Sequence, residues 1–94
     1  MRLRYSLRAQ ADLEAIFDYL GEHAPTRTRG ARIEIKRRIE QLREFPMMAP
    51  LTEIAGVREL SITRHPYKIY YEIRGDELYV LHIRHTRRRP WRGN

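Results

Sequence analysis

Apolar residues recur at helical spacing along the first half of the chain. They form one stripe between residues 9 and 20 and a second stripe between residues 31 and 45. Both stripes have the 3.6-residue period of a helix that buries a single face. Their members are Ala9, Leu13, Ile16, Phe17 and Leu20, followed by Ala31, Ile35, Ile39, Leu42 and Phe45. The pattern predicts two helices that pack through these faces.

Residues that cap or break helices mark the ends of these two segments. Ser6 is a suitable N-cap for the first helix, which we expect to run to about residue 22. The break between the two helices is marked by Gly21, Ala24 and Pro25. Thr26 or Thr28 can then cap the second helix, which extends to about residue 45. Ile33 falls on the side of this helix opposite its apolar stripe, which makes it a candidate contact for a partner.

Apolar and polar residues alternate in the remaining segments, with the period of two that is typical of strands. Alternation over residues 2–6 predicts a short first strand, and three more strands are expected over about 57–63, 67–74 and 77–85. Gly75-Asp76 separates the last two strands and is typical of a tight hairpin. We therefore predict one α+β domain over residues 1–94. A helical hairpin follows the N-terminal strand and covers one face of a three-stranded antiparallel meander.

A two-residue turn at Gly75-Asp76 sets the register of the hairpin. It pairs Tyr71 with Val80 and Ile69 with His82, so His82 is expected to be a hydrogen-bonded histidine in the core. The face predicted to lie beneath the helices carries Leu60, Ile62, Ile69, Tyr71, Ile73, Leu78 and Val80.

The opposite face of the predicted sheet is unusually aromatic for a solvated surface. It carries Glu59, Ser61, Thr63, Lys68, Tyr70, Glu72, Tyr79, Leu81, Ile83 and His85. Two interpretations are open. Either this face binds a partner in a groove or stacks bases between Tyr70 and Tyr79, or the C-terminal tail folds back over Leu81 and Ile83.

The overall charge adds an anionic partner to this picture. The 94 residues carry a formal charge of +7 and have an isoelectric point near 10.4, which is typical of proteins that bind nucleic acid or an acidic protein. There is no cysteine, so disulfides and thiolate sites are excluded. The N-terminus has no continuous apolar stretch, so we expect no signal peptide or membrane span, and a cytoplasmic location.

Positive charge is most concentrated at the C-terminus. From Leu81 to Asn94 the chain has five arginines, no acidic residue and the single tryptophan. The predicted register places Arg64, Tyr67 and Arg84 in one cross-strand row. Arginine is suited to bidentate recognition of phosphate or carboxylate. A histidine among these arginines, such as His85, should have a pKa below its usual value and can act as a neutral base.

The hairpin sequence resembles a known toxin family. Its first strand reads Pro-Tyr-Lys-Ile-Tyr-Tyr from residue 66, and its second strand ends in His-Thr-Arg-Arg from residue 85. Together with the order and length of the predicted elements over nearly the whole chain, these residues resemble the RelE/ParE toxins of bacterial type II toxin–antitoxin modules, and within them the ParE-like branch.

The resemblance implies a toxin that is neutralised by a cognate, acidic antitoxin and needs no cofactor or metal. ParE-type members inhibit DNA gyrase, whereas RelE-type members cleave mRNA in the ribosome. Under the ribonuclease alternative, Lys68 and Arg87 match catalytic positions of the family and His85 is a candidate base. However, the C-terminal tyrosine of the ribonucleases has no counterpart, and Glu59, Ser61 and Thr63 replace their lysine pair. These departures favour gyrase over the ribosome as the target.

Two sets of candidate binding residues follow from this interpretation. The expected target-binding residues are Arg64, Arg84, Arg87, Arg88, Arg89 and Trp91. The expected antitoxin-binding residues are Ile33, Tyr70, Tyr79, Leu81 and Ile83. A basic module that binds DNA or RNA without chemistry is a second hypothesis, although no helix-turn-helix pattern is apparent. A metal-dependent hydrolase is disfavoured because the four histidines lack carboxylates at ligand spacing.

Overall fold

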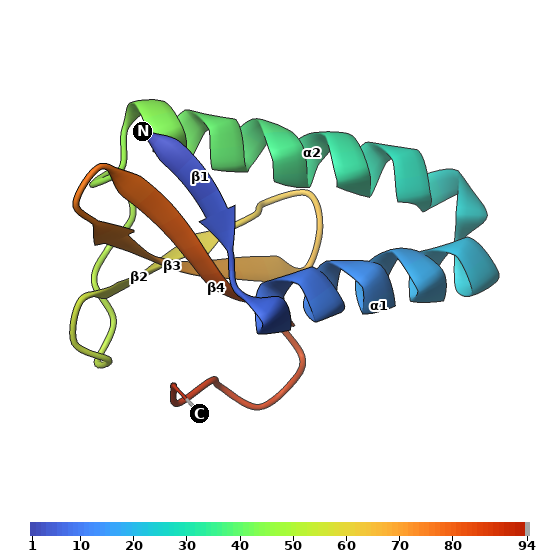
Figure 1. Cartoon of the computed structure of the whole chain (residues 1–94). Coiled ribbons are helices and arrows are strands. Elements are labelled where there is room, and N and C mark those ends of the chain that lie inside the picture. Colours follow the sequence, from blue (N-terminus) through green and yellow to red (C-terminus); the bar gives the residue numbers. More distant parts are fainter. Residues whose placement is uncertain (94) are drawn as a thin grey trace.

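The computed structural model describes residues 1–93 and confirms the predicted α+β architecture. Strand β1 (Arg2–Tyr5) leads into two helices, α1 (Leu7–His23) and α2 (Pro25–Glu44). Strands β2 (Val57–Ser61), β3 (Tyr67–Arg74) and β4 (Glu77–His85) follow. The helices form an antiparallel hairpin whose connection projects beyond the sheet (Figure 1).

Local capping explains where the helices begin. The Ser6 side chain accepts a hydrogen bond from the Ala9 N–H at 2.9 Å, so its predicted role as the N-cap of α1 is confirmed. The predicted cap of α2 at Thr26 or Thr28 is wrong, because α2 already begins at Pro25. Proline suits the first helical position because its φ is fixed near the helical value. The N–H group that proline lacks would have no hydrogen-bond partner within the helix at this position.

The sheet has four strands in the order β1-β4-β3-β2. The three C-terminal strands form the predicted antiparallel meander, while β1 pairs in parallel with β4, from Arg2 opposite Glu77 to Tyr5 opposite Val80. Strand β1 ends halfway along β4, and α1 starts directly after it. As a result, α1 runs beside the second half of β4 and supplies the side chains that contact that edge.

The core lies between the helical hairpin and one face of the sheet. It contains the inward residues of α2 together with the central residues of the strands: Ile35, Ile39, Leu42, Leu60, Ile62, Ile69, Tyr71, Leu78, Val80 and Ile83. Leu13, Ile16 and Phe17 of α1 pack against it. The Tyr71 hydroxyl donates to the Pro46 carbonyl at 2.6 Å and so holds the loop that follows α2. Phe45, predicted to be the last core residue of α2, is exposed.

A β-bulge at Leu81 corrects the predicted register of the hairpin. Tyr71 pairs with Val80 as predicted, but Tyr70 pairs with His82 and Ile69 with Ile83, so Leu81 is an extra residue in β4. The bulge is held by Ser6, whose backbone N–H donates to the Val80 carbonyl and whose hydroxyl donates to the Leu81 carbonyl.

Beyond the bulge, every side chain of β4 lies on the face of the sheet opposite to the one predicted. Ile83, predicted on the outer face, is in the core, whereas His82, predicted in the core, lies beside Tyr70 on the outer face. The predicted row of Arg64, Tyr67 and Arg84 is also wrong, because Tyr67 pairs with His85 and Arg84 with Lys68.

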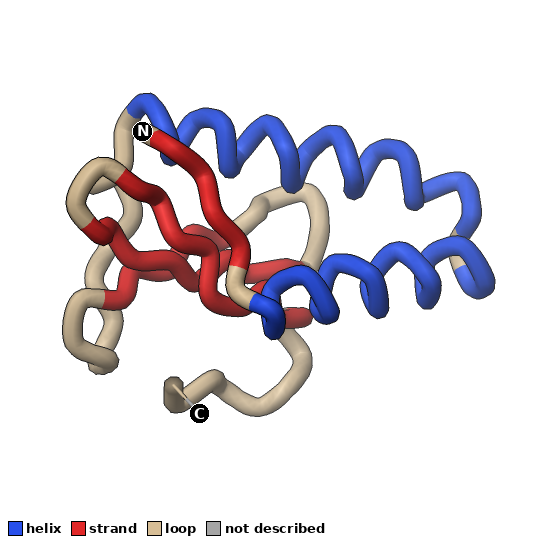
Figure 2. The backbone as a smooth tube through the Cα atoms, viewed as in Figure 1, coloured by secondary structure: helices blue, strands red, loops and turns tan. Residues whose placement is uncertain are grey.

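The C-terminal segment folds back along the face of the sheet that is turned away from α2 (Figures 1 and 2). The Trp91 ring contacts Tyr70 and His82, with centroid distances of 5.0 and 5.1 Å. The tail therefore covers part of the outer face, as one of the two interpretations had it. It packs on Tyr70 and His82 rather than on Ile83, because the bulge has exchanged these positions.

Candidate target-binding cleft

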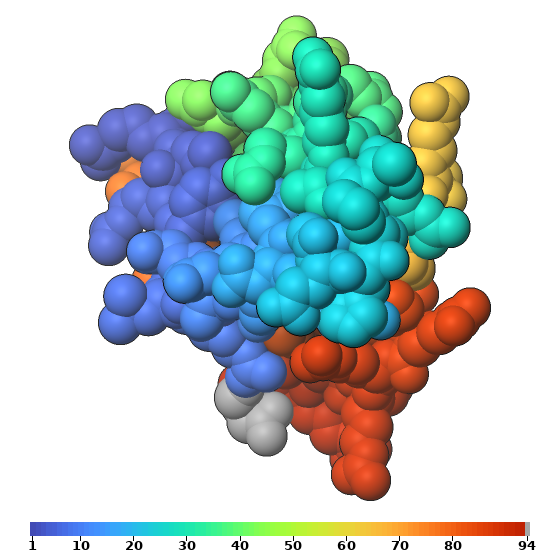
Figure 3. Space-filling view, turned by 90° about the vertical axis from the view of Figure 1, so that its right-hand side faces the viewer, coloured from blue at the N-terminus to red at the C-terminus, as the bar shows by residue number. Residues whose placement is uncertain are grey.

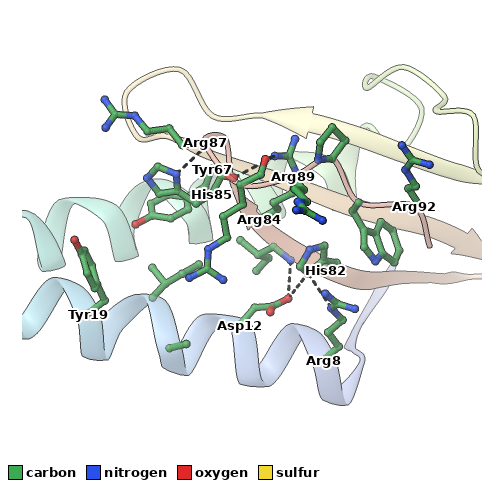
Figure 4. Close-up of a pocket in the computed structure, with 16 residues that line it drawn as sticks. Arg8, Asp12, Tyr19, Tyr67, His82, Arg84, His85, Arg87, Arg89 and Arg92 are labelled. Carbon is green, nitrogen blue, oxygen red and sulfur yellow. Dashed lines mark hydrogen bonds and ion pairs between the residues drawn. The ribbon is translucent and has the colours of Figure 1, made fainter. Parts of the chain in front are cut away.

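A cleft of about 1400 Å³ separates α1 from the C-terminal segment. In the space-filling view the C-terminal residues gather next to α1 on one side of the molecule (Figure 3). Within residues 1–93 the cleft is lined by six arginines, Arg8, Arg84, Arg87, Arg88, Arg89 and Arg92, and by a single carboxylate, Asp12. The sheet end that the sequence marked as most basic is therefore one wall of a cleft, and α1 is the other wall (Figure 4).

Asp12 joins α1 to β4 at the floor of the cleft. One of its carboxylate oxygens lies 2.6 Å from His82 Nδ1 and 3.0 Å from the Ile83 amide nitrogen. The Ile83 N–H points away from β3, beyond the end of β1, so the carboxylate replaces a missing strand partner. Arg8 Nε lies 3.2 Å from the same His82 nitrogen. We place the Nδ1 proton toward Asp12, since that distance is the shorter and the acceptor is charged.

Arg84 holds the backbone of the C-terminal turn. It is only 7% exposed, and its guanidinium donates to the carbonyl oxygens of His85, Thr86 and Arg88, the last at 2.7 Å. Its Nε also donates to the Tyr70 hydroxyl at 3.2 Å. The expectation that Arg84 presents its guanidinium to a target is therefore wrong, because these carbonyls already occupy it. Its role is to position the segment that carries Arg87, Arg88 and Arg89.

His85 is neutral at the end of β4 and has a defined tautomer. Burial lowers its pKa below the usual value, and the positive charges of Arg87, Arg88 and Arg84 lower it further. The arginines alone had predicted this direction of the pKa shift. His85 Nδ1 accepts a hydrogen bond from the Arg87 N–H at 3.1 Å, so the proton of the neutral ring is on Nε2. The ring also meets Tyr67 edge to face.

The exposed arginines of the cleft differ from the cations that form ion pairs on other parts of the surface. Away from the cleft, ion pairs join Arg2 to Asp76, Arg4 to Glu77, Arg37 to Glu34, Arg43 to Glu40, Lys68 to Glu59 and Arg74 to Glu72. Within residues 1–93, none of Arg87, Arg88, Arg89 or Arg92 takes part in an ion pair, and all four are exposed. The tail wall of the cleft thus carries four exposed cations without an ion pair among the described residues.

Other predicted site residues lie outside the cleft. Arg64 is exposed in the loop between β2 and β3, on the side of α2, where it adds to the lowering of the Glu34 pKa that is caused mainly by Arg37. Lys68 is on the outer face of the sheet with its ammonium 2.7 Å from Glu59. The cleft accordingly combines Arg87, Arg88, Arg89, Trp91 and His85 of the expected residues but not Arg64 or Lys68.

The expected antitoxin-binding set is divided by the bulge and the tail. Tyr70 and Ile83 are each 3% exposed, so the expectation that they form an open contact surface is wrong. Ile33 is 55% exposed on α2, as predicted. Tyr79 and Leu81 are partly exposed, and the Tyr79 ring lies between the guanidinium groups of Arg4 and Arg74.

Sequence reasoning missed the contribution of α1 to the cleft. Arg8, Asp12 and Tyr19 all line it, and in Figure 4 they extend from the same helix toward the C-terminal segment. The spacing of Arg8 and Asp12, four residues apart, already places them on one helical face. Only the parallel pairing of β1 with β4 brings that face to the sheet end.

Residues 1–93 contain neither a cluster of metal ligands nor a helix that could span a membrane. No group of three or more histidine, aspartate and glutamate side chains is arranged there as metal ligands. None of the helices in this part of the chain has the length and apolar character needed to cross a membrane.

A match to a known protein family identifies the family of this chain. Residues 3–90 match the family described as ParE toxin of type II toxin-antitoxin system, parDE. The chain belongs to the ParE toxin family. It is also 33% identical over 84 residues to Toxin RelE2 of Caulobacter vibrioides, an alignment that covers 89% of this chain and 93% of that relative. The resemblance to the RelE/ParE superfamily and its ParE-like branch is therefore confirmed.

Solved structures support the same assignment. A chain of the chromosomal ParDE toxin–antitoxin system from P. aeruginosa matches this ParE-type toxin with a TM-score of 0.78 and 28% identity, covering 92% of this chain and 96% of that chain. The intact RelBE toxin–antitoxin complex of E. coli matches with a TM-score of 0.67 but only 13% identity, over 93% of this chain and 98% of that chain. The second match shows the shared fold alone.

Proposed function

We propose that this ParE-type toxin inhibits DNA gyrase in the cytoplasm and is neutralised by an acidic antitoxin that binds it directly. The observation that carries the proposal is the family match over residues 3–90, since gyrase is the target that this branch of the superfamily implies. The match to a chain of the P. aeruginosa ParDE system supports the antitoxin partner.

The geometry of the expected catalytic residues supports inhibition by binding rather than RNA cleavage. A general base needs a free lone pair near the proton that it removes. In neutral His85, Nδ1 accepts the Arg87 N–H and Nε2 carries the proton, so neither nitrogen offers one. Lys68 has its ammonium 2.7 Å from Glu59 and is not among the residues that line the cleft. The ion pair of Lys68 and the hydrogen bond to His85 therefore support the gyrase proposal over the ribonuclease alternative.

The antitoxin surface that we propose is centred on the helical hairpin and the part of the sheet that the tail leaves open. Ile33 on α2 and Tyr79 on the outer face remain as candidate contacts, together with Leu81. Arg27, Arg29, Arg32 and Lys36 on α2 are exposed and surround Ile33. An acidic segment that folds as it binds would combine apolar contact at Ile33 with attraction to these cations.

A brief expression experiment in bacteria tests the proposed target. The toxin is induced alone, and plasmid supercoiling and the DNA-damage response are compared with the integrity of transcripts mapped at codon resolution. We expect loss of negative supercoiling and DNA damage while transcripts stay intact. Codon-positioned cleavage of mRNA with normal supercoiling would overturn gyrase as the target and return Lys68, His85 and Arg87 to consideration.

A binding measurement tests the antitoxin surface separately. Ile33→Asp adds a negative charge at an exposed apolar contact without disturbing the core. We expect it to weaken binding of the antitoxin encoded beside the toxin by at least tenfold. Ala55→Asp adds the same charge at an exposed position in the loop before β2, outside the proposed surface, and serves as a control for electrostatics. Equal affinities of Ile33→Asp and the wild-type toxin would remove this face from the interface.

A further inference from the structure

The cleft between α1 and the C-terminal segment carries four arginines, Arg87, Arg88, Arg89 and Arg92, that form no ion pair within residues 1–93. Of the twelve acidic residues in the chain, only Asp12 lines it. That carboxylate already accepts hydrogen bonds from His82 and from the Ile83 N–H. The four exposed arginines on the tail side therefore face the cleft with no competing carboxylate among the residues that line it.

The tail wall is pre-organised by internal contacts. Arg84 donates to three backbone carbonyls of the turn after β4, and His85 Nδ1 accepts the Arg87 N–H, so the backbone that carries Arg87, Arg88 and Arg89 is fixed from within. In Figure 4 the side chains of Arg87, Arg89 and Arg92 project from this segment, while Arg8 and Tyr19 project from α1. Fixing the donors in advance lowers the entropy lost when a ligand is bound.

The dimensions and lining favour a polymer over a small anion. The cleft volume of about 1400 Å³ exceeds the range of about 300–1000 Å³ that is usual for small-molecule pockets. Its lining also includes the rings of Tyr19, Tyr67 and Trp91. Guanidinium groups bind phosphate oxygens in a bidentate manner, and exposed aromatic rings such as Tyr19, which is 60% exposed, can stack against bases. An acidic peptide would share the attraction to the arginines but has no bases to stack on Tyr19.

We propose that this cleft binds the phosphodiester backbone of DNA, with Arg87, Arg88, Arg89 and Arg92 as the phosphate contacts and Tyr19 as a stacking surface. The choice of DNA rests on the proposed function, since gyrase holds DNA while it acts. The toxin then contacts the DNA in the gyrase complex directly. Asp12 and Arg84 are positioning residues, because each acts by holding another part of the cleft.

Fluorescence anisotropy with the purified toxin tests this proposal without gyrase. The probes are labelled 20-nucleotide single-stranded DNA, the same sequence as duplex DNA, and the same sequence as RNA, each titrated at several salt concentrations. Four phosphate contacts predict a slope of about −3.6 for log K against log salt on duplex DNA and about −2.8 on single-stranded DNA. We expect binding to both forms of DNA, and binding to RNA no tighter than to DNA.

A matched pair of variants locates the site. Replacing Arg87, Arg88 and Arg89 together by glutamine should weaken DNA binding at least tenfold and reduce the duplex slope by about 2.7, that is, by three phosphate contacts. The control replaces Arg27, Arg29 and Lys36 by glutamine, which removes the same charge from exposed positions on α2. We expect this control to bind DNA within threefold of the wild-type toxin and with an unchanged slope.

The outcomes distinguish the cleft from the gyrase proposal. Equal loss of affinity in the two triple variants, or no DNA binding by the wild-type toxin at low salt, would overturn the cleft as a DNA site. Tenfold tighter binding of RNA would overturn the choice of DNA. Displacement of DNA by poly-glutamate at equal charge concentration would overturn phosphate recognition. DNA binding at the cleft in a toxin that leaves gyrase active would support the cleft and contradict the proposed function.

Discussion

Asp12→Ala tests the link between α1 and β4 on which the shape of the cleft depends. The substitution removes the acceptor of two hydrogen bonds, at 2.6 Å from His82 Nδ1 and 3.0 Å from the Ile83 amide nitrogen. The Ile83 N–H has no strand partner on that side, so it is left unsatisfied in the variant.

The expected cost can be worked from these contacts. Hydrogen bonds to a charged group contribute about 1.5–3 kcal/mol each. Because the Asp12 side chain remains 20% exposed and water can enter, we take about 2.5 kcal/mol for the two bonds together. Alanine returns about 0.5 kcal/mol through its higher helix propensity. The net loss in the free energy of unfolding should therefore be about 2 kcal/mol, which corresponds to a fall of roughly 10 °C in Tm for a domain of this size.

Urea unfolding of the purified toxin, followed by circular dichroism, measures this loss. Asp18→Ala is the matched control, because Asp18 is an exposed acidic residue of the same helix. It should leave the toxin as stable as the wild type or up to about 0.5 kcal/mol more stable. Asp12→Asn, which keeps one carbonyl acceptor, should fall between Asp12→Ala and the wild type. A difference of less than 0.5 kcal/mol between the two alanine variants would refute the inference that Asp12 holds the edge of β4.

Three further predictions concern the loop after α2, the pH dependence and the tail. Tyr71→Phe removes the donor to the Pro46 carbonyl and should lower the free energy of unfolding by about 1 kcal/mol in the same urea assay; an unchanged midpoint would contradict it. His85 has a lowered pKa in the folded toxin. As the pH falls below about 6.5, the unfolded chain therefore binds a proton before the folded toxin does. The stability contributed by the neutral ring is lost as the pH falls toward the lower pKa of the folded state. His85→Gln should flatten this loss between pH 7.5 and 5, and parallel stability profiles of the two proteins would count against it. Trp91→Ala removes the contacts with Tyr70 and His82 and should speed trypsin cleavage after Arg87 or Arg88 severalfold; cleavage at the wild-type rate would show that Trp91 does not anchor the tail.

Hydrophobic periodicity was sufficient to predict most of the secondary structure. The stripe from Ala31 to Leu42 and the Ser6 cap follow from local rules, and the hairpin turn at Gly75-Asp76 pairs Arg74 with Glu77 as predicted. These features depend on neighbours within a few positions, which a sequence pattern contains.

The details that shape the cleft depend on contacts between distant parts of the chain. An alternating pattern continues smoothly through Leu81 and gives no sign of an extra residue, yet the bulge exchanges the faces of His82 and Ile83. The bulge is held by Ser6, more than seventy positions earlier in the chain. Likewise, the parallel pairing of β1 with β4 brings Asp12 to the sheet end, and no local signal predicts it.

The positive charge of the candidate site was predicted from the sequence, but the tertiary contacts that shape the site were not. The cluster Arg87, Arg88 and Arg89 stands out in the sequence, and these residues line the cleft. Arg84 looks identical in the sequence but is buried and bonded to backbone carbonyls. Charge patterns identify a basic segment, whereas tertiary contacts decide which of its arginines reach the solvent.

The central claim is that this ParE-type toxin acts on DNA gyrase, and a supercoiling assay with purified components tests it most directly. Relaxed plasmid, ATP and gyrase are incubated with increasing toxin, alone and after addition of the antitoxin encoded beside it. We predict that supercoiling decreases with toxin concentration and is restored by antitoxin. Unchanged supercoiling at a large molar excess of folded toxin would contradict the account.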